Sequence, residues 1–330
     1  MAEFEKTMKK PLLEVENLRV SFTTPRGIVR AVNGVSYTLQ EGEVLGIVGE
    51  SGSGKSVESY AIMGLLAKNA KIESGSSIRF QGKELTEMNE KEYEAFRGKE
   101  ASMIFQNPMT SLNPVHTIGK QLMEAYLIHE KEASKEEASK RALEILSQVG
   151  MTEPEKRLKQ FPHELSGGMR QRVMIAMGMI SHPKLLIADE PTTALDVTIQ
   201  AQILELIRRL QKETGMAVVF ITHNLGVVAE ICDSVAVMYA GSIVEKGDAR
   251  EVFYEPKHPY TLGLLRSMPS MEPSENERLI PIPGNPVNLL ELPEGCAFRP
   301  RCEKACPQCE SGPIPMRSLS DSHQFRCCVD

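Results

Sequence analysis

The sequence predicts an α/β fold in which helices cover a parallel sheet, with a helical insertion and a small cysteine-rich C-terminal extension. Three observations support this prediction. Short apolar runs rich in β-branched residues alternate with helical patterns, the segment from about 107 to 165 interrupts the alternation, and six of the seven cysteines lie in the last 35 residues. Strand–helix–strand order with continuously apolar strands is typical of a parallel sheet buried on both faces.

The composition is that of a folded globular protein, because 41% of the 330 residues are hydrophobic and 25% are charged. A net charge of −6 argues against a nucleic-acid partner. No apolar run approaches the ~20 residues that a membrane-spanning helix needs, and the N-terminal segment lacks the apolar core of a signal peptide. We therefore expect a cytoplasmic chain, in which clustered cysteines are more often metal ligands than disulfides.

Three short apolar runs are predicted to be neighbouring strands of the sheet: "VLGIVG" (44–49), "KLLIADE" (184–190) and "MAVVFITH" (216–223). Helices are predicted over 55–68 and over 198–215, where apolar residues recur at helical spacing and a glycine ends the second pattern. The run 129–150 is predicted to be a highly charged helix with one apolar edge inside the helical insertion. "VAVMYAGSIVEKG" is typical of a hairpin at which a sheet ends.

"GESGSGKS" (49–56) matches the phosphate-binding pattern G-x-x-x-x-G-K-[ST] and lies between a predicted strand and a predicted helix. Its glycines let successive backbone N–H groups point inward, and the following helix adds its positive end. Lys55 would reach the β- and γ-phosphates, and the hydroxyl of Ser56 would bind Mg²⁺. The alternative is a glycine-rich turn without a ligand. The predicted nucleotide-binding residues of this loop are Gly49, Glu50, Ser51, Gly52, Ser53, Gly54, Lys55 and Ser56.

"LLIADE" supplies two acidic residues at the carboxyl end of a predicted strand, where ligands of open α/β sheets bind. Asp189 is predicted to hold Mg²⁺, and Glu190 to polarise the attacking water as a general base. The alternative is an acidic pair that caps the next helix.

"LSGGMRQR" (165–172) forms a second small-residue helix start able to meet a phosphate, through Ser166, Gly167 and Gly168. Two such starts in one chain suggest two nucleotides shared between two subunits.

With these motifs the chain resembles the ATP-binding cassette family over residues 12–260. "MIFQNP" corresponds to the Q-loop with Gln106, "LLIADEPTTALD" includes a D-loop at Ala194, Leu195 and Asp196, and "VFITH" supplies a switch histidine, His223. The resemblance implies a P-loop NTPase cassette over 1–250, with a RecA-like parallel core, an antiparallel β subdomain and a helical subdomain at about 107–165.

The family's mechanism implies that two cassettes close head to tail, with ATP between the P-loop of one and the signature loop and Asp196 of the other. Gln106 would reach Mg²⁺, His223 would stabilise the transition state, and Glu190 would align water. Phe22 is the candidate for stacking on adenine, with Arg30 as a substitute, and the alternative for Phe22 is a packed edge-strand residue.

Further segments, among them "FYEPKHPYTLGLL" and "IPGNPVNLLELPEGCAFRPRC", are similar to the ATPases of the dipeptide/oligopeptide/nickel importer group. This resemblance implies ATP-driven import of peptides or related small solutes and a C-terminal extension at 251–330. It also implies two permease subunits, a paralogous ATPase subunit or a second copy of this chain, an extracytoplasmic solute-binding protein, and a peripheral position on the cytoplasmic face of the membrane.

In that group the extension has four cysteines, which in some members carry a 4Fe–4S cluster. The family's spacing selects Cys296, Cys302, Cys309 and, four positions after His323, Cys327, within the segment 294–330. Cys306 and Cys328 depart from the pattern. Four thiolates suit an iron–sulfur cluster or structural zinc, and free thiols are the third alternative. We expect a structural staple, because a proline-rich segment with few apolar residues cannot fold alone.

Two other classes of function remain open. One is a soluble cassette ATPase acting on ribosomes or DNA, although such proteins carry paired cassettes or long coiled coils. The other is a small-molecule kinase, which would lack "LSGG" and the switch histidine.

Overall fold

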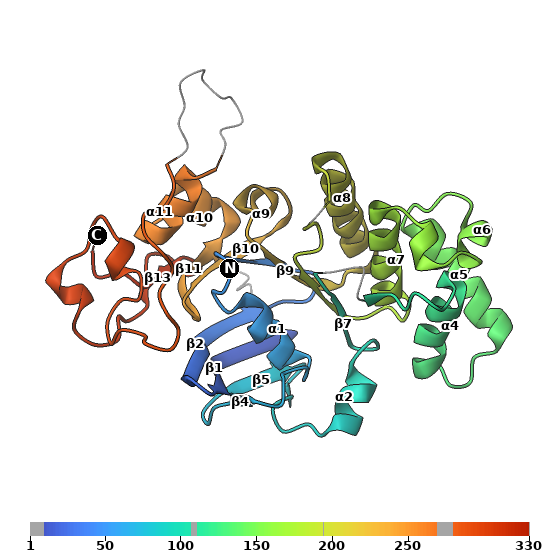
Figure 1. Cartoon of the computed structure of the whole chain (residues 1–330), viewed down its shortest axis with the longest axis horizontal. Helices are drawn as coiled ribbons and strands as arrows, with labels where there is room; N and C mark the ends of the chain where they lie inside the picture. The colour runs from blue at the N-terminus through green and yellow to red at the C-terminus, as the bar shows by residue number, and fades with distance from the viewer. Residues whose placement is uncertain (1–9, 107–110, 194, 269–279, 330) are drawn as a thin grey trace, which may run out of the picture.

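The computed structural model describes residues 10–106, 111–193, 195–268 and 280–329, and in this part of the chain a mixed sheet of eight strands lies at the centre (Figure 1). Its five parallel strands follow the order β10-β3-β9-β8-β7. They are β3 (Val44–Val48), β7 (Ala101–Ile104), β8 (Leu185–Asp189), β9 (Ala217–Thr222) and β10 (Ser234–Tyr239). Every residue of β3, β8 and β9 is buried, which confirms the three predicted strands.

Two hydrophobic cores lie on the two faces of this sheet. On β9, Phe220 belongs to the core shared with α7 (Gly167–Met179), α8 (Val197–Thr214) and α9 (Leu225–Ile231), whereas Ile221 belongs to the core shared with α1 (Lys55–Ile62). Successive residues of a strand point to opposite faces, so a strand buried on both sides must be apolar throughout. The parallel sheet with helices on both faces is therefore as predicted.

The first helix is shorter than the predicted 55–68, because α1 ends at Ile62. Gly64 follows with φ +62°, and a Cβ there would lie 2.7 Å from the ring of Tyr93. The helix ends at this glycine, whose N–H donates to the carbonyl of Ala61, while the N–H of Leu65 donates to the carbonyl of Tyr60. Gly64 also packs closely against Tyr93 of α2 (Glu90–Phe96). The predicted helix at 198–215 is confirmed, since Asp196 caps α8 and Gly215 ends it in a left-handed conformation.

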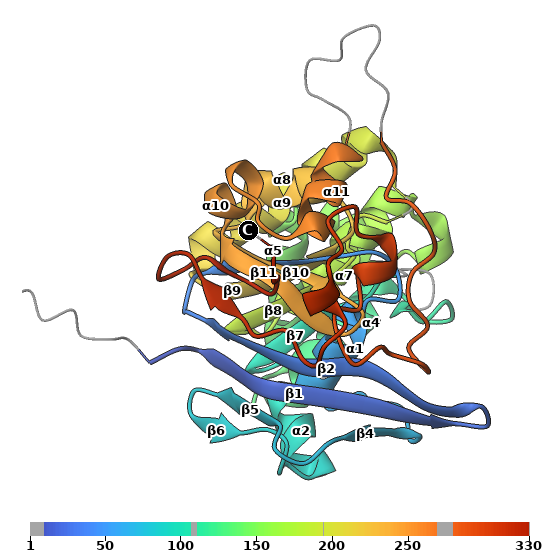
Figure 2. The same ribbon diagram turned by 90° about the vertical axis from the view of Figure 1, so that its left-hand side faces the viewer.

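A second, antiparallel sheet packs below α1, as the family resemblance implied (Figures 1 and 2). Its strands are β1 (Leu13–Thr24), β2 (Gly27–Leu39), β4 (Ala70–Ile72), β5 (Ser77–Phe80) and β6 (Lys83–Glu84). The long pair β1–β2 is irregular, with register shifts at three places, and its buried residues join the core on the α1 face.

A group of helices lies at the end of the molecule opposite the C-terminal segment (Figures 1 and 2). The group contains α4 (Ile118–His129), α5 (Lys135–Gln148), α6 (Pro154–Leu158) and a 3₁₀ turn at Pro162–Glu164. The charged helix predicted at 129–150 starts later than expected, because Ser134 and Glu137 form a capping box that begins α5. Residues 107–110 of the predicted helical subdomain, and Ala194, lie outside the described residues.

The predicted hairpin is confirmed, since β10 pairs antiparallel with β11 (Ser242–Asp248). The expectation that the sheet ends there is wrong. β13 (Gln324–Phe325) pairs with β11, and β12 (Arg317–Ser318) pairs with β13, so the C-terminal segment extends the central sheet. Strands of two residues carry no periodicity that a sequence could reveal. The helices α10 (Ala249–Tyr254) and α11 (Pro259–Arg266) lead from β11 toward this segment.

A buried carboxylate fastens the C-terminal segment to the sheet. Glu245 of β11 is fully buried, and it accepts hydrogen bonds from the backbone N–H groups of Lys257 (2.7 Å) and His258 (2.9 Å). Its other contact is Nε2 of His323 at 2.8 Å, with the histidine side chain only 1% exposed. Phe298 adds an apolar anchor, because its ring packs against Tyr239 and Tyr260.

We expect Glu245→Ala to destabilise the protein by about 3 kcal/mol or more, since it leaves two backbone N–H groups and one imidazole buried without their acceptor. Urea unfolding would measure the loss, and limited proteolysis should cut within 281–329 earlier than in the wild type. The control is Glu310→Ala, which removes an exposed partner of Arg299 and should cost about 1 kcal/mol or less. Equal stability of the two variants would contradict the proposed anchor.

His258 gives the same region a pH dependence. Burial lowers the pKa of His258 from 6.5 to about 3, and its Nδ1 accepts the N–H of Tyr260 at the start of α11. Because the unfolded chain takes up the proton first, the stability contributed by the neutral imidazole is complete above pH 6.5. It falls by about 1.4 kcal/mol per pH unit as the pH decreases below that value.

We expect His258→Asn, which keeps a capping side chain, to abolish the pH-dependent part of the stability that His258 contributes. Urea unfolding between pH 7 and 4.5 should show the wild type losing stability faster than the variant. His163→Asn removes an imidazole at an exposed position and is the matched control. Parallel pH profiles for wild type and His258→Asn would refute the prediction.

Candidate active site

The predicted site residues gather at one edge of the central sheet, where three strands end side by side. Because β9 lies between β3 and β8, the loop after Val48, the end of β8 at Asp189 and the residue after Thr222 are neighbours. The carboxyl ends of parallel strands are where open α/β sheets bind ligands. This edge therefore holds the glycine-rich loop, the acidic pair and the switch histidine together, as the motifs predicted.

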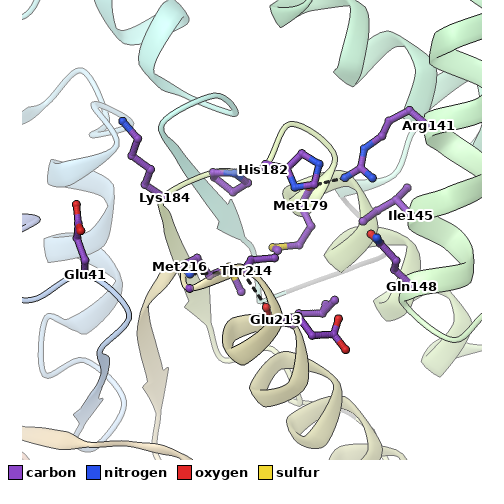
Figure 3. Close-up of a pocket in the computed structure, with 13 residues that line it drawn as sticks. Glu41, Arg141, Ile145, Gln148, Met179, His182, Lys184, Glu213, Thr214 and Met216 are labelled. Atoms are coloured by element: carbon purple, nitrogen blue, oxygen red, sulfur yellow. Dashed lines mark hydrogen bonds between the residues drawn. The ribbon is translucent and has the colours of Figure 1, made fainter.

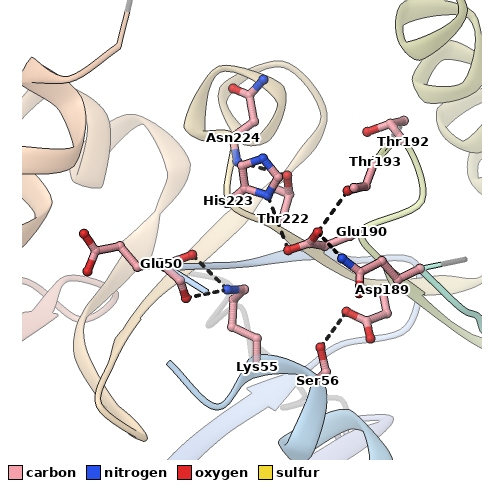
Figure 4. A network of polar contacts seen from close by, with 12 residues as sticks. Glu50, Lys55, Ser56, Asp189, Glu190, Thr192, Thr193, Thr222, His223 and Asn224 are labelled. Atoms are coloured by element: carbon pink, nitrogen blue, oxygen red, sulfur yellow. Dashed lines mark hydrogen bonds and ion pairs between the residues drawn. The ribbon is translucent and has the colours of Figure 1, made fainter. Parts of the chain in front are cut away.

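The glycine-rich loop folds around the ammonium group of Lys55. Nζ donates to the carbonyl oxygens of Gly49 (2.8 Å) and Glu50 (2.9 Å) (Figure 4). Gly49 has no room for a side chain, because a Cβ would lie 2.1 Å from the carbonyl oxygen of Met238. Gly54 has φ +101°, a conformation that favours glycine.

The first turn of α1 presents backbone N–H groups without a side-chain cap. Gly54 is its N-cap residue and has no side-chain acceptor, although its carbonyl accepts the N–H of Glu58. The uncapped N–H groups and the helix dipole make this turn suited to phosphate oxygens. Ser53 is buried beside Lys55, whereas Ser51 and Gly52 are exposed at the loop's surface. The described geometry is that of a phosphate cradle.

Ser56 and Asp189 form the candidate metal position. The hydroxyl of Ser56 donates to Oδ1 of Asp189 at 3.0 Å, and Asp189 is 1% exposed (Figure 4). Burial, together with the charge of Glu190, raises the pKa of Asp189, while Ser56 and Lys55 oppose the shift. A divalent cation bound here would favour the ionised carboxylate. A hydroxyl and a carboxylate are hard oxygen ligands of the kind that Mg²⁺ prefers.

Glu190 is the residue on which the predicted catalytic groups converge. Its carboxylate accepts from Nε2 of Gln106 at 2.8 Å and lies 3.3 Å from Nδ1 of His223. Thr193, which the sequence did not suggest, donates its hydroxyl at 2.9 Å (Figure 4). The backbone of Glu190 is left-handed, with φ +46°, and its N–H donates to the carbonyl of Ile221. Strained conformations of this kind cluster at functional sites.

Glu190 is a carboxylate at neutral pH. Burial by itself would raise its pKa, but hydrogen bonds from Thr193 and His223 and the positive charge of Lys55 lower the pKa below 4.5. The group therefore accepts hydrogen bonds rather than donating them. It can orient a water molecule by accepting one of its protons.

The signature loop and the D-loop lie beside each other on two helices. Ser166 caps α7 by accepting the N–H of Met169 at 3.3 Å, and Asp196 caps α8 by accepting the N–H of Ile199 at 2.9 Å. A Cβ on Gly168 would lie 2.9 Å from Ile199, so glycine permits this close packing. Both caps are consistent with helix starts alone, and contacts of Ser166, Gly167, Gly168 or Asp196 with a nucleotide stay a prediction.

Phe22 and Arg30 occupy different settings. Phe22 lies on β1, paired with Val29 and Ala70, and its side chain packs partly buried against the core of the antiparallel sheet. Arg30 is exposed on β2, and the carbonyl of the next residue, Ala31, lies against Gly54 of the P-loop. Arg30 is thus adjacent in sequence to a residue that lies against the phosphate cradle. The adenine-stacking role stays a prediction for both residues.

A buried carboxyl group behind the P-loop was also missed from the sequence. Glu58 of α1 is fully buried and accepts a hydrogen bond from the hydroxyl of Tyr37. Burial raises the pKa of Glu58 to about 7, with a smaller contribution from the charge of Asp189. Its only sequence signal is an acidic residue three positions after Lys55 in an otherwise small and apolar helix.

None of the seven cysteines, all within the described residues, forms a disulfide. Three thiols of the C-terminal segment lie close together. The Sγ atoms of Cys306, Cys309 and Cys328 are 3.2–3.7 Å apart. Of the four predicted ligands, only Cys309 belongs to this group. The structure thus places Cys309 beside Cys306 and Cys328, the two cysteines that depart from the family spacing.

The other three predicted ligands are nearby. The backbone N–H of Cys296 donates to the carbonyl of Cys309 at 2.8 Å. Burial raises the pKa of Cys296 and of Cys302, and the thiols of Cys309 and Cys327 add to both shifts. Several thiols brought together in this way fit a metal ion or cluster, which would need them as thiolates. The predicted set of four stays a prediction.

The seventh cysteine, Cys232, is buried at the end of α9. A Cβ on Gly46 of β3 would lie 2.9 Å from its Sγ. Cys232 therefore packs as a small apolar residue.

A hollow of about 520 Å³ lies away from these residues (Figure 3). Lys184 and Met216, which line it, directly precede β8 and β9. The hollow therefore lies at the amino ends of the strands, opposite the edge that carries Asp189 and His223. None of the predicted site residues lines it.

Two family descriptions match the chain. Residues 32–193 match the family described as ABC transporter. Residues 244–309 match the C-terminal region of the oligopeptide/dipeptide transporter family. The first match contains the P-loop, Gln106, the signature loop and Glu190, and the second contains the cysteine-rich segment as far as Cys309. Within the described residues, no helix is both long and apolar enough to cross a membrane.

Similar proteins match over nearly the whole chain. The oligopeptide transport ATP-binding protein OppD of Salmonella typhimurium is 55% identical over 96% of this chain and 93% of that protein. OppD of Bacillus subtilis is 56% identical over 96% of this chain and 88% of that protein. The dipeptide transport ATP-binding protein DppD of Bacillus subtilis is 53% identical over 96% of this chain and 94% of that protein.

Solved structures match the cassette. A dimeric ATP-binding cassette in a post-hydrolysis state, bound to ADP and Pi, aligns with a TM-score of 0.65 and 28% identity over 72% of this chain and 99% of that chain. The protein cbiO1 of Clostridium perfringens, part of the ABC transporter complex cbiONQ, aligns with a TM-score of 0.63 and 29% identity, over 75% of this chain and 92% of that chain.

Proposed function

The chain belongs to the ABC transporter family, and we propose that it is the ATP-hydrolysing subunit that powers the import of peptides through separate permease subunits. The observation that carries the proposal is the convergence of Lys55, Glu190 and His223 at the ends of three neighbouring strands. Relatives that share more than half of its residues over nearly its whole length include oligopeptide and dipeptide transport ATP-binding proteins. No observation favours a ribosome, DNA or kinase function.

The P-loop is proposed to hold the triphosphate of ATP. The backbone N–H groups of residues 49–56 would donate to phosphate oxygens, and Lys55 would exchange its contacts with Gly49 and Glu50 for the β- and γ-phosphates. Ser56, Asp189 and Gln106 are proposed to hold Mg²⁺, which when bound neutralises negative charge on those phosphates. Phe22 or Arg30 is proposed to stack on the adenine.

Glu190 is proposed to orient the attacking water. Its carboxylate is ionised, and its position is set by Gln106, Thr193 and His223. In a nucleotide-bound site, Gln106 would turn toward the metal, and His223, whose side chain is 60% exposed, would turn toward the γ-phosphate. Positioning and charge stabilisation of this kind account for most of phosphoryl-transfer catalysis.

A second subunit is proposed to complete the site. Ser166, Gly167, Gly168 and Asp196 would face the γ-phosphate of a nucleotide bound to the other cassette, in a dimer closed by ATP. We propose a paralogous ATPase as that partner, with a homodimer as the alternative. The dimer would dock on two permease subunits at the cytoplasmic face of the membrane, and a solute-binding protein would deliver the cargo from outside.

We further propose that residues 251–330 form an extension whose cysteine-rich segment, 294–330, carries a 4Fe–4S cluster or, as the alternative, zinc. Cys296, Cys302, Cys309 and Cys327 would be the ligands, and the bound group would act as a structural cross-link. The proximity of the thiols supports this proposal. Hydrolysis of ATP needs no electron, so no redox step is assigned to the segment.

We expect Glu190→Gln to bind ATP with an affinity close to that of the wild type and to hydrolyse it at least ~100-fold more slowly, because the uncharged amide accepts a hydrogen bond from water but cannot act as a general base. In gel filtration with ATP and Mg²⁺, the variant and its partner cassette should remain a closed dimer. Glu213→Gln, at an exposed position of α8, is the control. Hydrolysis at the wild-type rate would remove Glu190 from this role.

Single serine substitutions at the six clustered cysteines should identify the ligands. We expect iron content to fall in the variants of Cys296, Cys302, Cys309 and Cys327 and to remain in those of Cys306 and Cys328, in protein purified without oxygen. Loss of iron on substitution of Cys306 and Cys328 would instead select the three thiols that lie closest together. A colourless protein with stoichiometric zinc would exclude the cluster.

A further inference from the structure

The P-loop has an ion pair with the C-terminal segment. The guanidinium of Arg301 donates from one terminal nitrogen to Oε2 of Glu50 at 2.6 Å and from the other to Oε1 at 3.0 Å. The side chain of Arg301 is 4% exposed, and that of Glu50 is 27% exposed. Two parallel charge-assisted hydrogen bonds fix both distance and orientation. A residue 251 positions away in the chain therefore holds the second residue of the phosphate loop.

Arg301 is itself rigidly held. Its Nε donates to the carbonyl of Pro283 at 2.8 Å, and its guanidinium lies 5.9 Å from the ring centres of both Tyr239 and Phe298. Contact with aromatic faces and a fixed planar fork distinguish arginine from lysine at such a position. Ordering the side chain is thus part of the packing of the segment, and the contact with Glu50 requires little further loss of freedom.

A second contact holds the backbone of the same P-loop residue. The N–H of Glu50 donates to the hydroxyl of Tyr260 at 2.8 Å, and Tyr260 is completely buried in α11. The rings of Tyr260 and Phe298 lie 5.3 Å apart. Both the carboxylate and the amide of Glu50 are therefore bound by groups that follow the cassette in sequence and that both pack against Phe298.

The charge of Glu50 gives this arrangement a consequence for the nucleotide. The carbonyl of Glu50 accepts from Lys55, so this residue forms part of the wall of the phosphate cradle. A carboxylate on that wall repels a polyphosphate unless a cation neutralises it. The bidentate contact with Arg301 supplies that cation.

We propose that Arg301 is a positioning residue for the nucleotide site, which neutralises Glu50 and holds the P-loop in its phosphate-binding shape. The inference rests on the proposed ATPase function and adds the C-terminal segment to the site. Phe298 and Arg301 lie between Cys296 and Cys302, so a group bound by these two thiols would fix the turn that carries the arginine. The affinity for ATP thereby depends on the order of the cysteine-rich segment.

The test compares Arg301→Gln with wild type in the full-length protein, by equilibrium binding of ATP and Mg²⁺ and by steady-state hydrolysis. We expect Kd and KM for ATP to rise about tenfold and kcat to change by less than about twofold, because the arginine acts on binding and does not touch the reacting atoms. Arg299→Gln, in the same 3₁₀ turn but half exposed and paired with Glu310, should leave Kd, KM and kcat unchanged.

The double variant Glu50→Gln/Arg301→Gln separates neutralisation from simple loss of structure. With the carboxylate removed, we expect Kd to return to within about threefold of the wild type. Arg301→Lys should be intermediate, because it keeps the charge and loses the fork. If the double variant binds as weakly as Arg301→Gln and both melt earlier than the wild type without nucleotide, the arginine is only structural and the inference is overturned.

Failure of the inference can be told apart from failure of the proposed function. Wild-type protein that does not bind ATP with Mg²⁺ would overturn both. Wild-type protein that binds ATP, together with an Arg301→Gln variant of equal affinity, would overturn the inference alone.

Discussion

The order of three strands, β3-β9-β8, is the constraint on which the site depends. In this order the register pairs Val48 with Thr222 and Ile221 with Asp189, so the phosphate loop, the switch histidine and the acidic pair leave the sheet at the same edge. Each strand is buried on both faces, and a one-residue shift in register would move every side chain of the strand into the core on the opposite face. The hydrophobic cores therefore fix the spacing of polar groups that themselves contribute nothing to those cores.

The C-terminal segment is held by the same sheet. β13 extends it beyond β11, Glu245 joins three chain segments at one buried carboxylate, and Phe298 packs in the core that also contains Tyr239 and Phe220. The sequence changes character near residue 250, but the residues on either side of this boundary share one sheet and one hydrophobic core. Removing residues 251–330 would leave β11 at the edge of the sheet, uncover the ring of Tyr239 and take away both partners of Glu50.

The sequence predicted those features that are encoded locally. A complete phosphate-binding motif between a strand and a helix, apolar strands ending in Asp189 and His223, and Ser166 at a helix start all contain their signal within a few residues. The two-residue strands depend on β11, and the contact between Glu50 and Arg301 joins distant segments. Only tertiary packing decides such features, and a single sequence does not encode them in any local pattern.

The cysteines show how spacing and proximity can disagree. Spacing chooses Cys296, Cys302, Cys309 and Cys327, whereas the closest thiols are those of Cys306, Cys309 and Cys328. The two sets of thiols are linked through the backbone, because the N–H of Cys296 donates to the carbonyl of Cys309. Cys296 also flanks the turn that carries Arg301 to the P-loop. Metal bound at Cys296 and Cys302 would fix Arg301, whereas metal bound only at the other three thiols would leave that turn to its packing against Tyr239 and Tyr260. The identity of the ligands therefore determines how directly the cysteine-rich segment acts on the phosphate loop.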